Sequence, residues 1–369
     1  MKRTPQTSLL VVFTALFFIS GCVSRDAEKK LHESISYETI EKMLASGEGF
    51  EREEPFMIRK FDPDIKKGLL GNGISYGPYR DGQAPWGPGP SDEEILEDLR
   101  IIEKYWNVIR LYNTDDDTER IVRAIKDNGI KLEVMLGIWI SKEEGVPEGK
   151  ESNIRNILRC IRVANEYPDV VKAINVGNET QVFWSGHGVD QNALINYIRT
   201  VRKYTKVPVT TADDHMFWRE PESESVAAEI DFIVAHVYAL WNGKTLEESI
   251  PWTEETVNII KTEHPERTVV LGETGWATKY DPDKKGDGEQ GTLVKGEVGY
   301  EGQEQFLHKL DGWLKATGMT VFFFQVFDEP WKAGYEEGSD HIEKNWGVFY
   351  ESREPKISFK NYLKKQETE

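Results

Sequence analysis

The sequence predicts an α/β protein with one main domain folded as a (β/α)8 TIM barrel, and two patterns indicate this fold. From Gly73 onward, eight short apolar segments rich in Val, Ile and Phe recur, and most of them do not alternate in polarity. Such segments are typical of strands that are buried on both faces of a parallel sheet. Helical patterns separate the segments, and eight βα units are most simply a closed barrel. An open doubly wound sheet is the alternative, but it usually carries a Gly-rich phosphate-binding turn, which this sequence lacks.

The expected strands and helices follow one another in a regular order. Strands are expected over residues 73–79, 108–113, 132–140, 173–179, 207–213, 232–238, 269–275 and 320–327. Apolar residues at helical spacing predict helices over residues 118–127, 153–166, 192–204, 254–262 and 303–316, and a weaker pattern covers 223–230. Ser91 and Glu94 form a capping box, which predicts that a further helix begins directly after Ser91. Gly129 is expected to end the helix over residues 118–127.

The first 21 residues have the pattern of a bacterial lipoprotein signal peptide. Lys2 and Arg3 form a basic head, and the apolar run over residues 9–19 is too short to span a bilayer. Small residues then precede Cys22, which resembles a lipobox, in which the cysteine receives a lipid and becomes the new N-terminus. This resemblance predicts lipidation of Cys22 and a location in the cell envelope, anchored at the outer membrane or cell surface. An ordinary secretory signal followed by a chance cysteine is the alternative.

Between the signal peptide and the barrel, residues 22–67 are charged and weakly patterned. We expect them to form a tether from the membrane surface, with one amphipathic helix near residues 37–44. The folded domain is expected over residues 68–369. Its longest irregular stretch, residues 278–298, follows the seventh expected strand, and a loop of this length is typical of a functional flap or a mobile segment.

The charge balance excludes two classes of partner. The 369 residues include 46 Lys and Arg against 64 Asp and Glu, which gives a net charge of −18. Nucleic acid and anionic lipid both require positive charge, so neither is expected as the main partner, whereas a neutral glycan is compatible. Membrane contact is expected only through the lipid on Cys22, and we expect a monomer. The other cysteine, Cys160, lies on the apolar side of a predicted helix and is expected to be an unreactive buried thiol.

No metal and no cofactor are expected. The seven His residues show no repeated ligand spacing. Asp213, Asp214 and His215 occur together at the end of the fifth expected strand, and we interpret them as polar residues at the rim of a binding groove. Ser185 lacks the Gly-x-Ser-x-Gly frame of a serine hydrolase.

Two glutamates lie at strand ends, where such barrels carry their active sites. Glu179 ends the fourth expected strand, and Glu273 lies near the end of the seventh. Glycoside hydrolysis needs two carboxyl groups that flank the scissile bond, of which one is a protonated acid and the other an ionised nucleophile or base. A separation of about 5–5.5 Å implies retention of the anomeric configuration, and about 6.5–9.5 Å implies inversion. Either glutamate alone could equally be a surface carboxylate, so it is the pair and its neighbouring residues that indicate a catalytic site.

The neighbouring motifs resemble those of glycoside hydrolase family 17, the β-1,3-glucanase family of clan A. They are Gly-Ile-Ser-Tyr-Gly-Pro-Tyr at 73–79, Arg-Leu-Tyr at 110–112, Val-Gly-Asn-Glu at 176–179, Gly-Glu-Thr-Gly-Trp at 272–276, Phe-Asp-Glu-Pro-Trp-Lys at 327–332 and Trp-Gly-Val-Phe at 346–349. The resemblance implies that Glu179 is the acid/base and Glu273 the nucleophile. It also implies that Asn178 hydrogen-bonds the sugar 2-hydroxyl and that Tyr238 holds the nucleophile carboxylate. Arg110 is a second candidate donor to that carboxylate, or alternatively the ion-pair partner of Glu133 or another strand acid on the barrel floor.

Aromatic residues supply most of the remaining candidate contacts with substrate. Seven tryptophans fall at or just after a strand end, namely Trp86, Trp139, Trp184, Trp218, Trp241, Trp276 and Trp331. A pyranose presents a flat C–H face that stacks on an aromatic ring, so we expect sugar subsites there, although core packing is the alternative for each one. The residues that we predict to bind substrate are Tyr76, Arg110, Tyr112, Asn178, Trp184, Tyr238, Trp276, Glu329 and Trp331. The alternative for Glu329 is a charge at the rim.

The resemblance and the pair of glutamates together predict a retaining, endo-acting glycosidase. Its expected substrate is β-1,3-glucan of the laminarin type, cleaved by a two-glutamate double displacement without a cofactor. A β-1,3-glucanosyltransferase and an exo-β-1,3-glucosidase are alternatives within the same chemistry. An alternative of another class is a non-catalytic glycan-binding lipoprotein built on a degenerate barrel.

Overall fold

The computed structural model describes residues 36–281, 294–334 and 338–367. By its internal contacts the chain divides into two units, residues 1–39 and residues 40–369. The predicted signal peptide, Cys22, and the segments 22–35 and 282–293 of the expected tether and flap lie outside the described residues. The first helix in the described part is α2, Tyr37–Ser46, which agrees with the helix expected near residues 37–44.

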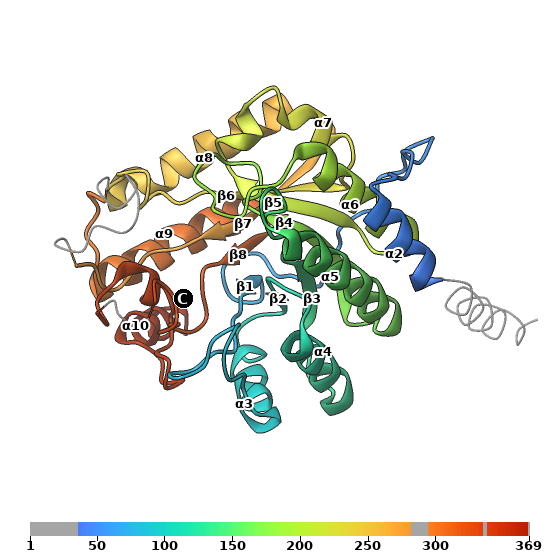
Figure 1. Ribbon diagram of the computed structural model, residues 1–369. Helices are drawn as coiled ribbons and strands as arrows, with labels where there is room; N and C mark the ends of the chain where they lie inside the picture. The colour runs from blue at the N-terminus through green and yellow to red at the C-terminus, as the bar shows by residue number, and fades with distance from the viewer. Residues whose placement is uncertain (1–35, 282–293, 335–337, 368–369) are drawn as a thin grey trace, which may run out of the picture. The chain divides into compact units, whose positions relative to one another are not determined.

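The second unit is a closed barrel of eight parallel strands, as the sequence predicts (Figure 1). Each strand pairs with the next along the chain, and the last pairs with the first. The strands are β1 Gly73–Ser75, β2 Val108–Arg110, β3 Glu133–Ile138, β4 Val171–Asn178, β5 Val209–Asp214, β6 Phe232–His236, β7 Thr268–Thr274 and β8 Val321–Phe323. All eight expected strands are therefore present, although several are shorter than expected.

Helices follow the strands and surround the barrel (Figure 1). They are α3 Asp92–Ile102, α4 Asp116–Asn128, α5 Pro147–Glu166, α6 Gln191–Tyr204, α7 Ser223–Ala227, α8 Leu246–Glu263, α9 Tyr300–Thr317 and α10 Ile357–Gln366, with short 3-10 turns η1 Phe217–Arg219 and η3 Ile342–Lys344. The expected capping box forms at Ser91, where the side chain accepts from the backbone N–H of Glu94. Gly129 ends α4 in a left-handed conformation, as expected, and its φ of 63° is one that glycine adopts without strain.

One apolar cluster fills the barrel and takes residues from seven of its eight strands. Its members are Val108, Met135, Ala173, Ala212, Phe232, Val234, Val270 and Phe322, each at most 1% exposed. Phe61 and Ile65 pack against this cluster. Phe61 stacks on Phe232, the first residue of β6. Phe61 and Ile65 therefore cover the end of the barrel at which the strands begin. Polar residues lie at the opposite end of the barrel, where the strands finish.

Residues 50–67, which belong to the expected tether, are packed on the barrel domain. The guanidinium of Arg59 donates to the backbone carbonyls of Arg202 and Thr205, at the end of α6 where carbonyls lack helical partners, and to that of Val207 in the segment that follows. The backbone N–H of Arg59 donates to Asp231 at 2.7 Å. Residues upstream of residue 68 thus make specific contacts with the folded domain. The composition of this segment alone does not reveal these contacts.

Candidate active site

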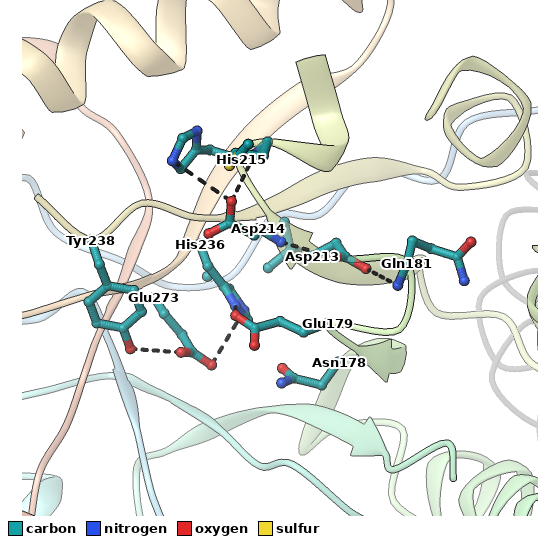
Figure 2. Close-up of polar contacts among 12 residues, drawn as sticks. Asn178, Glu179, Gln181, Asp213, Asp214, His215, His236, Tyr238 and Glu273 are labelled. Carbon is teal, nitrogen blue, oxygen red and sulfur yellow. Dashed lines mark hydrogen bonds and ion pairs between the residues drawn. The ribbon is translucent and has the colours of Figure 1, made fainter. Parts of the chain in front are cut away.

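A row of titratable side chains crosses the end of the barrel at which the strands finish. Asp214 on β5 is in register with His236 on β6, which in turn is in register with Glu273 on β7. Residues in register on neighbouring strands project from the same face of a sheet, so these three side chains lie together. Glu179 directly follows β4 and joins them, as Figure 2 shows.

A bulge brings Glu273 into this row. The pairing of β6 with β7 shifts between Ala235 and His236, so that Gly272 is passed over and His236 pairs with Glu273. Bulges of this kind re-aim a side chain and are common beside active sites. Gly272 suits this position because a Cβ atom there would lie 2.2 Å from a side-chain carbon of Val234.

The carboxylate of Glu273 is held by four groups. Arg110 Nη1 donates to Oε1 at 2.6 Å and the Tyr112 hydroxyl donates to the same oxygen at 2.9 Å. Tyr238 donates to Oε2 at 2.7 Å, and His236 Nε2 lies 3.3 Å from Oε1. Burial opposes ionisation of Glu273, but the charges of His236 and Arg110 and the hydrogen bonds outweigh it, so the pKa of Glu273 lies below its ordinary value. The side chain, 8% exposed, is therefore an ionised carboxylate in a preformed setting.

Glu179 has a different environment. Its side chain is 29% exposed, and Oε1 lies 2.7 Å from Nδ1 of His236. Its backbone is left-handed, with a φ of 49°, and its N–H donates to the carbonyl of Ala212 on β5. The two glutamates are thus chemically unequal, since Glu273 is surrounded by donors whereas Glu179 faces one imidazole and solvent. This inequality is what an acid and a nucleophile in one site require.

His236 links the two glutamates and was not among the residues that we predicted to form the site. It is fully buried, with Nδ1 toward Glu179 and Nε2 toward Glu273. Burial lowers the pKa of His236, but the charges of Glu273 and Glu179 and the hydrogen bond to Glu179 raise it by more, so the pKa lies above its ordinary value. The signal that could have identified it is the His-Val-Tyr sequence at the end of β6 and directly after it, because His236 and Tyr238 are two residues apart and both reach Glu273.

Arg110, Tyr112, Tyr238 and Asn178 lie in the site, where the sequence analysis expected them. Arg110 is fully buried, and its contact is with Glu273 rather than with Glu133. Its Nη2 donates to Asn178 Oδ1 at 2.6 Å, which fixes the orientation of that amide. Its Cζ also lies 4.5 Å from the centre of the Tyr112 ring, so the arginine orders three neighbours at once.

Two residues that we predicted to bind substrate are placed elsewhere. Tyr76 is 1% exposed, and its hydroxyl donates to Asp98 of α3. Trp276 is 0% exposed, stacks on Phe306 of α9 and donates to the carbonyl of Glu297. Both side chains therefore pack between the barrel and its helices and cannot contact a sugar in the site. Trp218, among the seven tryptophans expected at the mouth, is also fully buried.

Other aromatic residues remain at the rim. Trp331 makes edge-to-face contacts with Trp86 and Tyr79, which come from the segment after β1. Trp184, after β4, makes an edge-to-face contact with Phe183. Trp86 and Phe183 are 71% and 91% exposed, so flat apolar surface is available on two sides of the mouth.

Two further carboxylates belong to the surroundings of the site. Glu329 is buried, with Oε2 2.8 Å from Lys332 Nζ and Oε1 accepting from the indole of Trp331. Glu343, in η3, was missed by the sequence analysis because it lies far from any strand end. Burial is the main cause that raises the pKa of Glu343 to about 7. The charges of Glu179 and Glu273 also raise this pKa, whereas the charge of Lys332 lowers it.

The residues Asp213, Asp214 and His215 carry no metal-binding arrangement. Both carboxylate oxygens of Asp213 accept backbone N–H groups, and Asp214 Oδ1 accepts from the N–H of Met216. Within residues 36–281, 294–334 and 338–367, no group of three or more His, Cys, Asp or Glu is arranged to hold a metal ion. None of the helices in the same ranges is long and apolar enough to span a membrane.

Comparison with known families decides the assignment of the domain. The profile of the BtgE/BtgC glycoside hydrolase domain matches residues 73–347, most of the chain, from β1 to the segment after η3. The chain belongs to this family. The match covers both Glu179 and Glu273 together with the strands that carry them.

Curated relatives agree with this family. A probable glucan endo-1,3-beta-glucosidase btgC of Aspergillus flavus is 27% identical over 286 residues, which are 73% of this chain and 40% of the relative. The btgC glucosidase of Emericella nidulans is 25% identical over 70% of this chain and 40% of its own length, so the chain spans less than half of either relative.

Two solved structures share the fold. An endo-laminarinase from Formosa Hel1_33_131 has a TM-score of 0.69 at 22% identity, over 81% of this chain and 88% of its own. A family 17 β-1,3-glucanosyltransferase from Rhizomucor miehei has a TM-score of 0.61 at 22% identity, over 78% and 96%.

Proposed function

We propose that the protein is a retaining, endo-acting glycoside hydrolase that cleaves β-1,3-glucan of the laminarin type. The observation that carries this proposal is the inequality of the two glutamates. Glu273 is an ionised carboxylate fixed by Arg110, Tyr112 and Tyr238, whereas Glu179 is partly exposed beside the same His236. The names of the curated relatives, which are glucan endo-1,3-beta-glucosidases, support β-1,3-glucan as the substrate class.

The reaction follows from the placement of the two carboxyl groups. Glu179 donates its proton to the glycosidic oxygen while Glu273 attacks the anomeric carbon, so that the C–O bond to the leaving chain breaks and a glycosyl ester forms. Glu179, now a carboxylate, takes a proton from water, whose oxygen attacks the same carbon and releases Glu273. Arg110 and Tyr238 keep Glu273 ionised and oriented, and no metal or cofactor takes part in these steps.

Endo-acting cleavage is favoured by the position of the exposed aromatic side chains. Trp86 with Trp331 lies after β1 and β8, and Phe183 with Trp184 lies after β4, so stackable surface is present on both sides of the two glutamates. An aromatic ring binds a pyranose by stacking on its C–H face. A chain that stacks at both places would have its scissile bond at an internal position.

The test uses purified protein, laminarin and NMR of the first products. We expect a range of short oligosaccharides that form first as β-anomers, and we expect Glu273→Gln to bind laminarin but release no product. Glucose alone would indicate an exo enzyme, and products longer than a defined laminari-oligosaccharide substrate would indicate a transferase. Binding of laminarin by the wild-type protein with no product at all would favour the glycan-binding alternative instead.

We also propose that Cys22 carries a lipid that anchors the enzyme in the cell envelope. The support is the sequence alone, namely the basic head, the short apolar run and the small residues before Cys22. Fractionation of cells that produce the full chain tests this proposal. Cys22→Ala should move the protein from the membrane to the soluble fraction, while Cys160→Ala, a change at the buried cysteine, should leave it in the membrane.

A further inference from the structure

A buried aspartate at the end of β5 holds the chain segment that follows Glu179. Asp213 is 0% exposed, and both of its carboxylate oxygens accept backbone N–H groups. Oδ2 accepts from Gln181 at 2.9 Å and Oδ1 accepts from Asp214 at 2.9 Å (Figure 2). The first bond joins β5 to the loop after β4, and the second fixes the carboxylate on its own strand. Asp213 is therefore anchored at one oxygen and holds a neighbouring loop with the other.

The loop needs such a contact because the backbone of Glu179 is strained. A residue with a side chain pays about 1–2 kcal/mol to adopt the left-handed region, and Glu179 lies there with a φ of 49°. On one side of this residue, the N–H of Glu179 donates to the carbonyl of Ala212 at 2.9 Å. On the other side, the N–H of Gln181 donates to Asp213. Two consecutive residues of β5 thus hold the strained backbone of Glu179 between them.

We propose that Asp213 is a positioning residue for the acid/base Glu179, an inference that rests on the proposed function. Among the residues that the structure describes, His236 Nδ1 is the one hydrogen-bond partner of the Glu179 carboxyl group, so the position of this group depends mainly on its backbone. Glu273, by contrast, is held by four side chains and does not depend on the loop after β4. Loss of the bond between Asp213 and Gln181 should therefore disturb the proton donor and leave the nucleophile in place.

Asp213→Asn is a close steric match that breaks this arrangement. Asparagine has one carbonyl oxygen in place of two carboxylate oxygens, so its amide N–H2 must face one of the two backbone N–H groups. Either Gln181 loses its acceptor directly, or Asp214 does and the side chain that holds Gln181 is no longer fixed on β5. Thr211→Val on the same strand is the matched control, because the buried hydroxyl of Thr211 has no hydrogen-bond partner among the described residues and valine has the same shape.

The experiment compares two substrates whose need for an acid differs. Laminarin requires protonation of its leaving oxygen, whereas a 2,4-dinitrophenyl β-laminarioside has a leaving group that departs without it. We expect Asp213→Asn to lower kcat/KM on laminarin by at least about tenfold while changing kcat/KM on the aryl substrate by less than about threefold. Added azide, which attacks the glycosyl–enzyme without a base, should raise kcat of the variant on the aryl substrate and yield a glycosyl azide.

The ratio of the two kcat/KM values does not depend on how much of the variant is folded. A purely structural role of Asp213 would lower both values by the same factor and would overturn the proposal. Should Asp213→Asn not accumulate as folded protein, Asp213→Ser, which is smaller and retains one hydroxyl acceptor, carries the same comparison. If the wild-type protein cleaves both substrates and the variants have the same ratio of kcat/KM values as wild type, only the inference about Asp213 is overturned. A wild-type protein inactive on both overturns the proposed function as well.

Discussion

At the scale of single residues, the environment gives two identical side chains different chemistry. Glu273 is almost completely buried yet ionised, because Arg110 and His236 supply positive charge and two tyrosines donate hydrogen bonds. Glu179 shares the imidazole of His236 but has none of the other donors. Glycoside hydrolysis by two carboxyl groups assigns them different roles, and the different surroundings of Glu179 and Glu273 suit such a division.

Tyr238 offers a direct test of this account. Tyr238→Phe removes the hydroxyl that donates to Glu273 at 2.7 Å but keeps the ring against Phe324 and Trp346. A hydrogen bond to a charged group contributes about 1.5–3 kcal/mol, so kcat/KM on laminarin should fall by roughly ten- to a hundredfold. Steady-state kinetics with laminari-oligosaccharides measure this effect.

The matched control is Tyr350→Phe. Its hydroxyl donates to that of Tyr300 at 3.2 Å, and among the described residues no hydrogen bond joins it to Glu179 or Glu273. This change should leave kcat/KM within about twofold of wild type. An unaltered kcat/KM in Tyr238→Phe would show that the hydroxyl of Tyr238 is not needed to hold Glu273.

The sequence predicted the residues of the site better than it predicted the direction of their side chains. Glu179, Asn178, Arg110 and Tyr238 are tied to strand ends and to motifs, so their convergence at the barrel mouth follows from the topology. Tyr76 is also next to a strand end, but it projects toward α3, on the opposite face from Ser75. A side chain's direction at the end of a strand depends on register and bulges, which a single sequence does not reveal.

At the scale of secondary-structure elements, the segment 50–67 is the clearest addition to the sequence prediction. Its residues follow neither strand nor helix periodicity, so no pattern indicated that they pack on the domain. Arg59 caps the end of α6, and Phe61 covers the interior of the barrel at the ends where the strands begin. The end opposite the active site is thereby closed with apolar surface.

Phe61→Ala should lower the free energy of unfolding. The ring stacks on Phe232 with a centroid distance of 4.6 Å, and its removal opens part of the barrel core to water. Since Phe61 is only partly buried, we expect a loss of roughly 1–3 kcal/mol, below the value for a fully buried phenylalanine. Urea unfolding followed by tryptophan fluorescence measures the change.

Phe183→Ala serves as the comparison, because this ring is 91% exposed and its loss should change stability by less than about 0.5 kcal/mol. Equal stability of Phe61→Ala and wild type would mean that the segment is not part of the folded domain. A shortened soluble protein should accordingly begin upstream of Phe50, whose N–H already donates to Asn196 on α6.

Other elements show why boundaries are harder to predict than the order of elements. The helix expected from residue 254 begins at Leu246, because Thr245 and Glu248 form a capping box ahead of Pro251. The strand expected over residues 320–327 ends at Phe323. A proline inside a helix and an apolar loop after a strand both obscure the periodic pattern on which the prediction depends.

At the scale of the whole molecule, buried acids give the fold a dependence on pH. Burial is the main cause that raises the pKa of Asp213, Asp214 and Glu343 to about 7 each, and that of Asp328 to about 6. In the unfolded chain these carboxyl groups titrate near 4. Between about pH 4 and 7 the folded protein therefore holds protons that the unfolded chain has released, so stability falls as the pH rises through this window.

Glu343 isolates this effect in one side chain, which is not among the groups that hold Glu273. Its folded pKa lies above its unfolded value, so its contribution is most favourable below about pH 4 and is lost as the pH rises toward 7. Glu343→Gln removes the charge that burial disfavours. We therefore expect the variant to gain stability over wild type between pH 5 and pH 8. The gain in unfolding free energy should be on the order of 1 kcal/mol, which is less than the pKa shift alone would give because solvent reaches part of the side chain.

Urea unfolding of both proteins at pH 5 and pH 8 measures the difference, in which the other titrating groups cancel. Glu263→Gln, at the exposed end of α8, should show no such dependence on pH. A Glu343→Gln variant whose stability relative to wild type is the same at both pH values would mean that Glu343 remains ionised in the fold. In that case the positive charge of Lys332 would be enough to keep Glu343 ionised despite its burial.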